Sequence, residues 1–286
     1  MTKKVDGMPV KNIRRPARRR APLNGAGGRS DRILFNVKND PSTIAETTEG
    51  QFFFPVTERG ETTHFTVFTD DALLKSSIQV AKGVLRQCET DYNRLAGIFG
   101  GPRPSHFNVI VTSGNGGVHE HCTGTDLYCG SSGKNTEFTN RIVVMEEVEV
   151  FEALQNLGWN CQASNGEALS RVLGEQFHPP QGENLITAPI WLDGDQGRLD
   201  FVTQNHPGDV EPQSIGCAVL FMYYLRFQLG FQWSEIVQAG GATLADVYKK
   251  LTGKNDAFQS FSSLLEAHFP KGKPSGLKDD NPFPLP

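Results

Sequence analysis

The sequence predicts an α+β protein in which a mixed β-sheet is followed by a helical C-terminal part. Three observations predict this class. The 286 residues are 37% hydrophobic and 21% charged, which is enough apolar surface for a folded core. Short segments typical of strands occur in the first half, whereas the second half repeats apolar residues at spacings of three and four. No apolar run reaches the roughly 18 residues of a membrane span, so we expect no transmembrane segment.

The first expected elements are two strands and a long helix. Residues 51–56 and 64–69 are rich in aromatic and β-branched residues, and the turn Arg59–Glu61 joins them into a hairpin. Over residues 73–99 the apolar side chains recur at helical spacing, until Gly100 ends the pattern.

The middle of the chain adds strands and two helices with acidic side chains. Short apolar runs predict strands, and longer runs with three- and four-residue spacing predict helices. We expect strands over residues 107–111 and 141–145, an edge strand or hairpin over 122–129, and helices over 146–157 and 165–177.

Apolar spacing predicts that the last third is helical. The expected helices span residues 214–229, 234–239, 243–252 and 257–268. The expected organisation is therefore a basic tail (1–50), an α+β lobe (51–178), a loop-rich connection with a helical lobe (179–270), and a loose Pro- and Gly-rich tail (271–286).

The net charge of −4 conceals an uneven distribution. Residues 1–32 hold ten Lys and Arg against two Asp, so the remaining 254 residues hold 18 basic and 30 acidic side chains. This tail is too charged and too rich in Gly and Pro to pack, which predicts disorder. It is either an arm for nucleic acid or an anionic surface, or a solvated tail that folds back on the acidic body. No apolar segment follows its basic residues, which argues against a secretory signal and favours a cytoplasmic location.

The five cysteines exclude a dense disulfide scaffold. Cys122 and Cys129 flank six residues that a hairpin could fold back, so they are the candidate disulfide. Cys88, Cys161 and Cys217 lie in apolar or helical contexts and are expected to be buried thiols.

Two histidines precede the candidate disulfide. On a strand His119 and His121 would share a face, as metal ligands can, but the sequence offers no matching second pair. Metal binding at this point is therefore not the preferred interpretation.

The candidate chemistry lies on the two acidic helices. Glu146 and Glu149 are three residues apart and share a helix face, and Glu167 is one turn into the next helix. In zincin metallopeptidases a pair on one helix and a Glu from the following helix assemble three metal ligands. Glu147 and Glu152 are expected on a solvated face.

Over residues 65–268 the chain resembles the gluzincin group of zincins, which contains thermolysin-like and aminopeptidase-like peptidases. Residues 166–170 (GEALS) resemble the helix of the Glu ligand, and residues 215–225 resemble the family's G-x-x-x-L-F-x-x-x-L helix. Residues 245–253 and 258–261 resemble its closing stretch. The resemblance implies a zincin-like mixed sheet with active-site-type helices and a C-terminal helical lobe.

The zinc-binding HExxH motif of that family is missing. The motif's first His falls on Met145, its catalytic Glu on Glu146 and its second His on Glu149. Glu167 keeps the third-ligand position, with 17 residues between it and Glu149. A thioether with two carboxylates suits zinc poorly, whereas carboxylates suit Ca²⁺, Mg²⁺ or Mn²⁺. His206 lies where the family often supplies a side chain that stabilises the transition state.

Three functions remain open, and the sequence does not decide whether the protein is an enzyme. The leading hypothesis is a metallopeptidase-like protein without HExxH, inactive or repurposed, that binds a protein, peptide or small ligand in the former active-site cleft. The second is a peptidase-like hydrolase that uses Glu146, Glu149 and Glu167 with or without a divalent cation. The third is binding of nucleic acid or an anionic surface through residues 1–32.

Overall fold

The computed structural model describes residues 30–37, 50–70, 73, 76–131, 135–180, 186–194, 197–207 and 211–286, with side chains from Val56 onward, Ser76 excepted. It confirms the α+β class. The basic residues up to 29 lie outside the described residues, so their predicted role stays a prediction. Residues 30–37, expected to belong to an unstructured tail, form a strand instead.

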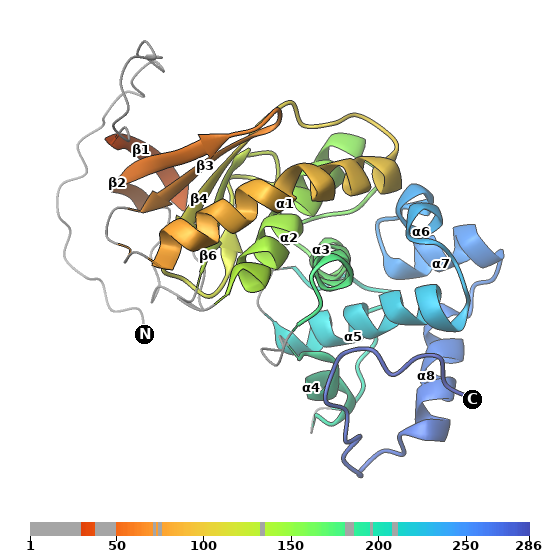
Figure 1. Cartoon of the computed structure of the whole chain (residues 1–286). Helices are drawn as coiled ribbons and strands as arrows, with labels where there is room; N and C mark the ends of the chain where they lie inside the picture. Colours follow the sequence, from red (N-terminus) through yellow and green to blue (C-terminus); the bar gives the residue numbers. More distant parts are fainter. Residues whose placement is uncertain are drawn as a thin grey trace.

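The strands form one mixed sheet of six (Figure 1). Its order is β1-β2-β3-β4-β6-β5, with parallel pairing of β3 with β4 and of β4 with β6, and antiparallel pairing elsewhere. The strands are β1 (Ser30–Val37), β2 (Gly50–Glu61), β3 (Phe65–Asp70), β4 (Phe107–Thr112), β5 (Gly117–Val118) and β6 (Asp126–Gly130).

Two long helices, α1 (Ser76–Phe99) and α2 (Thr136–Gln155), pack on one face of this sheet (Figure 1). Alternate strand residues such as Phe65, Val67 and Val109 point into the core that these helices share. The helix α1 also provides the crossover that parallel pairing of β3 and β4 requires.

The strand expected over residues 141–145 is wrong, because these residues lie inside α2. The helix begins after Asn135, whose side chain accepts a hydrogen bond from the Phe138 backbone N–H at 2.7 Å. From Phe138 to Glu152 every residue of α2 is buried. A helix enclosed on all sides has no polar stripe, so a short apolar run within it cannot be told from a strand by its periodicity.

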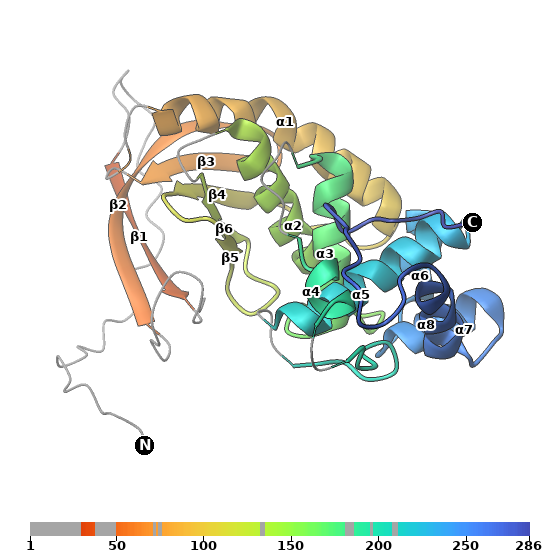
Figure 2. The same ribbon diagram turned by 90° about the horizontal axis from the view of Figure 1, so that it is seen from below.

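The remaining helices lie beyond α2, on the side away from the sheet (Figure 2). Those predicted over the last third are confirmed, and none of the described helices is long and apolar enough to cross a bilayer. They are α3 (Ser164–Phe177), α4 (Ala188–Leu192), α5 (Pro212–Tyr223) with the π-helical turn η1 (Tyr224–Gln228), α6 (Trp233–Ala239), α7 (Leu244–Thr252) and α8 (Ala257–His268).

The C-terminal segment is fixed to the helices rather than loose, although it forms no helix or strand. The buried carboxylate of Asp280 accepts hydrogen bonds from the backbone N–H groups of Thr187 and Ala188, both at 2.8 Å. Phe283 is buried against Tyr224, with ring centroids 5.9 Å apart. These contacts hold the chain end against α4 and η1.

His178 joins three helices at the end of α3. Its Nε2 lies 2.7 Å from Asp91 Oδ2 of α1, and its Nδ1 lies 2.9 Å from Glu137 Oε2 of α2. Burial alone would lower the pKa of His178, but Asp91 and Glu137 outweigh it and raise that pKa above its usual value.

We expect His178→Gln to destabilise the protein more at pH 6 than at pH 8.5. A histidine whose pKa is raised on folding stabilises the folded protein while it is protonated. The stabilisation is complete below the unfolded-state pKa of about 6.5 and is lost as pH rises through the folded-state pKa. Loss of the charged hydrogen bonds should lower the free energy of unfolding at pH 6 by roughly 1–3 kcal/mol. Denaturant titrations of both proteins at the two pH values measure this difference.

The control is His268→Gln in α8, because the His268 ring bonds a backbone carbonyl, that of Leu264. Its effect should not depend on pH in this way. A pH-independent cost of His178→Gln would contradict the assigned ion pairs.

A buried histidine–carboxylate cluster

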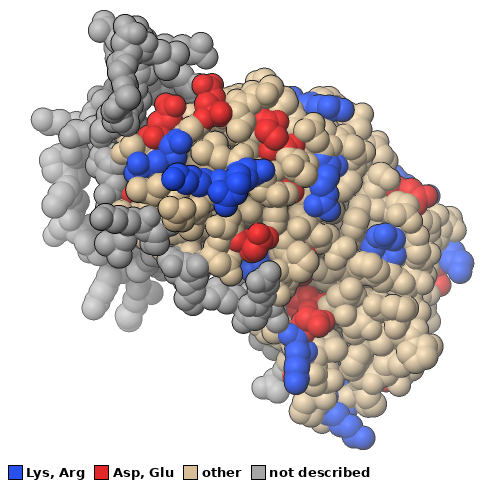
Figure 3. Space-filling view, in the orientation of Figure 1, with Lys and Arg blue, Asp and Glu red and all other residues tan. Residues whose placement is uncertain are grey.

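The acidic charge of α2 lies inside the protein. Glu146 and Glu149 are 6% and 8% exposed, and Glu147 and Glu152 are fully buried. The expected solvated face for Glu147 and Glu152 is therefore wrong, because the sheet, α1 and α3 enclose α2. On the surface shown in Figure 3, by contrast, acidic and basic side chains are interspersed.

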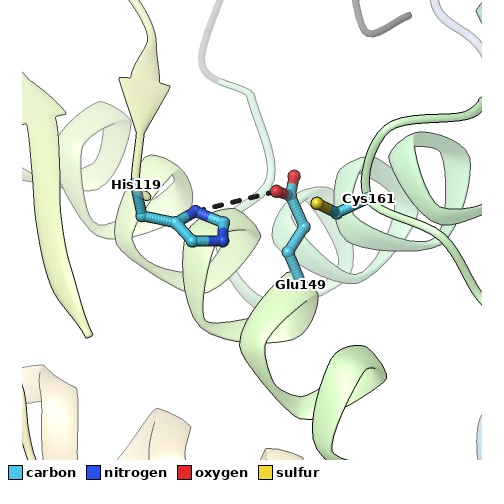
Figure 4. Close-up of side chains that lie close together, drawn as sticks. All are labelled: His119, Glu149 and Cys161. Carbon is cyan, nitrogen blue, oxygen red and sulfur yellow. Dashed lines mark ion pairs between the residues drawn. The ribbon is translucent and has the colours of Figure 1, made fainter. Parts of the chain in front are cut away.

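His119 enters this cluster from the loop after β5. Its Nδ1 lies 2.7 Å from Glu146 Oε2 and 3.7 Å from Glu149 Oε2, and its side chain is 3% exposed (Figure 4). The buried Nε2 of His119 has no hydrogen-bond partner in the described part of the chain. In the tautomer that donates from Nδ1 to Glu146, this Nε2 presents a free lone pair.

Glu149 lies among the other carboxylates of the cluster. Burial raises its pKa well above the usual value, and the charges of Glu167 on α3 and Glu146 raise it further. A hydrogen bond with Ser170 lowers the pKa of Glu149, but this offsets only part of the rise. The structure thus brings together Glu146, Glu149 and Glu167, and their mutual repulsion favours a proton or a cation among them.

Two further buried carboxylates of α2, Glu147 and Glu152, have different neighbours. Burial raises the pKa of Glu147, and so do Asp91 and Glu89 on α1. Burial also raises the pKa of Glu152, with Glu167 as the next cause. None of the four oxygens of Glu147 and Glu152 has a hydrogen-bond partner among the described residues. Glu152 therefore adds to the cluster, whereas Glu147 faces the α1 charges.

Gly117 on β5 lets the edge strand approach α2. A Cβ atom at this position would overlap the carboxylate of Glu146 and press on Ile142. Only glycine leaves room for the carboxylate beneath the strand, so β5 forms a direct cover over Glu146.

The disulfide predicted between Cys122 and Cys129 is wrong. Cys122 pairs with Cys161, with their Cα atoms 5.9 Å apart, and Cys129 is a free, buried thiol. Cys129 lies on β6 and points into the core under α2, where burial raises its pKa. The prediction that Cys161 is a free thiol is therefore also wrong, whereas Cys88 and Cys217 are buried and free as expected.

The disulfide fastens the His119 loop to the connection between α2 and α3. His121 and Cys122 both have a left-handed backbone, with φ of 53°. This tight turn leaves the side chain of His121 63% exposed, while that of His119 is buried. The predicted shared face of the two histidines is thus not observed.

Two candidate residues lie apart from these contacts. Met145 is buried and packs against Gly174 of α3. The backbone N–H of His206 donates to Ser164 Oγ at 3.1 Å, and its ring lies edge-on to Phe201. No described contact joins His206 to the carboxylate cluster.

The donor atoms of the cluster fit a divalent cation. Ligand atoms of His119, Glu149 and Cys161 all lie within 4.8 Å of one another, with Glu167 adding negative charge nearby. In the disulfide Cys161 offers no thiolate, which leaves carboxylate oxygens and an imidazole. Mn²⁺ accepts both kinds of ligand, and the oxygens alone suit Ca²⁺ or Mg²⁺.

His119 is the residue that sequence reasoning did not join to the glutamates. The signal was its position beside His121 and Cys122, but its partners lie about 30 residues further along the chain. No family model matches this sequence, and no curated protein matches it.

We expect Gly117→Ala to destabilise the protein by about 1–3 kcal/mol, as overpacking does, because the new methyl group would displace Glu146 or β5. The matched control is Gly97→Ala on α1, where an added Cβ meets nothing within 4 Å. That change should stabilise by about 0.5–1 kcal/mol through helix propensity. Denaturant unfolding measures both. Equal effects of the two substitutions would contradict the close packing of β5 on Glu146.

Proposed function

We propose that this chain is a metallopeptidase-like protein that binds a divalent cation through His119, Glu149 and Glu167. The buried Nε2 of His119, which has no hydrogen-bond partner among the described residues, carries the proposal, and Nδ1 of the same ring lies 3.7 Å from Glu149 Oε2. In this arrangement His119 takes the ligand role that the missing HExxH histidines would have had. Glu146 orients the His119 ring from behind, as carboxylates commonly do for metal-bound histidines.

The electrostatics of the cluster support a cation. Burial and the neighbouring carboxylates disfavour the charged form of Glu149, as its raised pKa indicates. A divalent cation would offset this repulsion and would give His119 Nε2 a partner. The function that follows is binding of Mn²⁺ or a similar cation that accepts oxygen and imidazole ligands.

The position of the edge strand β5 favours an extended peptide as the partner that binds beside the proposed cation site. β5 is the last strand of the sheet, and Gly117 places it directly over Glu146. Its outer edge pairs with no strand among the described residues, so its backbone groups are available to an added strand. Binding of a peptide beside the cation, without hydrolysis, is the lead form of the proposal.

Hydrolysis of the peptide is the second candidate, and the Glu146–His119 pair favours it. The 2.7 Å contact with His119 keeps the Glu146 carboxylate at the proposed cation centre, where it could act as a general base. Glu146 also occupies the position of the catalytic Glu in the gluzincin resemblance. In this version Glu146 would take a proton from the attacking water.

We expect Mn²⁺ to raise the Tm of the oxidised protein by roughly 5 °C at a hundredfold excess over its Kd, because such a ligand contributes about 2.7 kcal/mol. Glu149→Gln should abolish this shift, because it removes one charged ligand. Glu266→Gln, which alters an exposed carboxylate paired with Lys271, should leave it intact. Thermal melts with Mn²⁺, Ca²⁺, Mg²⁺ or a chelator measure these shifts, and a melt unchanged by every ion would contradict the proposal.

Hydrolysis is tested separately, on a library of unstructured peptides with Mn²⁺ present. If the protein is a hydrolase, Glu146→Gln should lower kcat by about 100-fold or more, as expected when a general base is lost, while peptide binding persists. Binding of peptides by the wild-type protein without any cleavage would leave the non-catalytic form as the function. Cleavage that is unchanged in Glu146→Gln would contradict the role given to Glu146.

A further inference from the structure

The disulfide lies beside His119 and Glu149 of the carboxylate cluster. Figure 4 shows the Cys161 sulfur and the His119 ring on either side of the Glu149 carboxylate. Donor atoms of the three residues lie within 4.8 Å of one another, which is the separation expected of ligands around one metal ion. The group contains Cys161 and not its partner Cys122. The Cys161 sulfur thus lies where a metal ligand would lie, but it cannot act as a thiolate ligand while it is bonded to Cys122.

We infer that reduction of the Cys122–Cys161 disulfide creates a second metal site, in which His119, Glu149 and the Cys161 thiolate bind Zn²⁺ or a similar borderline-soft cation. The inference rests on the proposed cation centre, because the two sites share His119 and Glu149. It adds that the redox state of the disulfide determines which metal is preferred. The oxidised protein offers oxygen and nitrogen ligands, and the reduced protein offers the Cys161 thiolate as well.

The reduction requires a dithiol, the class of reductant that exchanges with protein disulfides. One thiolate of the dithiol attacks one sulfur of the Cys122–Cys161 bond; the S–S bond breaks, the other protein sulfur leaves as a thiolate that takes up a proton, and a mixed disulfide forms. The second thiolate then closes a ring and releases the protein sulfur. Two electrons and two protons pass to the protein, and the dithiol becomes a cyclic disulfide. The Cys161 thiol loses its proton when it binds the metal.

The connection that carries Cys161 is held by hydrogen bonds as well as by the disulfide. The Ala163 N–H donates to Asn160 O, and the Gln162 N–H donates to Asn160 Oδ1, both at 3.0 Å. Trp159 Nε1 donates to Val237 O at 3.0 Å and fixes the connection to α6. Cys161 lies between these anchors, so we expect its sulfur to remain near Glu149 when the bond is broken.

The imidazole is already oriented for such a site. In the tautomer protonated at Nδ1, Glu146 Oε2 accepts a hydrogen bond from His119 Nδ1–H, and the buried Nε2 has no partner in the part of the chain that the structure describes. This is the arrangement in which a carboxylate fixes the tautomer of a metal-binding histidine. The His119 Nε2 atom is an observation independent of the cysteine, and it indicates a metal as the ligand.

Two single substitutions separate the thiolate from the disulfide. Cys122→Ser and Cys161→Ser both break the bond, but only Cys122→Ser leaves the Cys161 thiol in the cluster. Co²⁺ serves as the probe, because a thiolate ligand gives it a charge-transfer absorption that oxygen and nitrogen ligands do not. The two variants and the oxidised and reduced wild-type proteins are titrated with Co²⁺ and Zn²⁺. The reduced protein is freed of dithiol under nitrogen.

We expect thiolate-to-cobalt absorption in Cys122→Ser and in reduced wild-type protein, and none in Cys161→Ser or in oxidised protein. Zn²⁺ should bind Cys122→Ser at least about tenfold more tightly than Cys161→Ser, because a thiolate ligand is added. Folded Cys122→Ser and reduced protein that both lack the absorption would overturn the inference. If Cys122→Ser does not fold, reduced wild-type protein decides alone.

Mn²⁺ binding separates this inference from the proposed function. Oxidised wild-type protein tests the oxygen and nitrogen site, which needs no thiolate. Mn²⁺ binding without any thiolate-to-cobalt absorption would reject only the redox-dependent site. Thiolate absorption without Mn²⁺ binding to the oxidised protein would instead reject the proposed cation centre and retain the thiolate site.

Discussion

The burial of α2 from Phe138 to Glu152 is the constraint on which the site depends. Apolar residues such as Val144, Val148 and Phe151 fix this helix between the sheet, α1 and α3. The same enclosure removes the helix's carboxylates from water, where an isolated charge is costly. Each must then acquire a proton, an imidazole partner or a cation. The chemistry of the cluster therefore follows from the packing that stabilises the fold.

Three local devices hold a histidine against these carboxylates. Gly117 allows β5 to approach Glu146, the left-handed turn at His121 and Cys122 reverses the loop, and the disulfide fastens that loop to the α2–α3 connection. Each device acts through the backbone or a covalent bond. The closure of the 39-residue separation between Cys122 and Cys161 contributes about 4 kcal/mol in the chain-entropy account of disulfides.

Sequence reasoning recovered what depends on local pattern and missed what depends on tertiary contact. The strand at 107–111 follows from a short apolar run, and the helix at 165–177 follows from apolar residues spaced three and four apart. Residues 141–145 were assigned to a strand because a helix buried all round shows no period. Glu146 and Glu149 were found by their spacing on one helix. His119 was not joined to them, since only the pairing of β5 with β6 brings its loop over α2.

The source of the imidazole distinguishes this cluster from an HExxH site. In HExxH both histidines lie on one helix, so the helix alone fixes their separation. Here the helix supplies only carboxylates, and His119 comes from a loop that a disulfide ties down. The geometry of the ligands is therefore coupled to the state of a covalent bond outside the helix. In the proposed metal site, oxidation or reduction of that bond would therefore act on the ligands themselves.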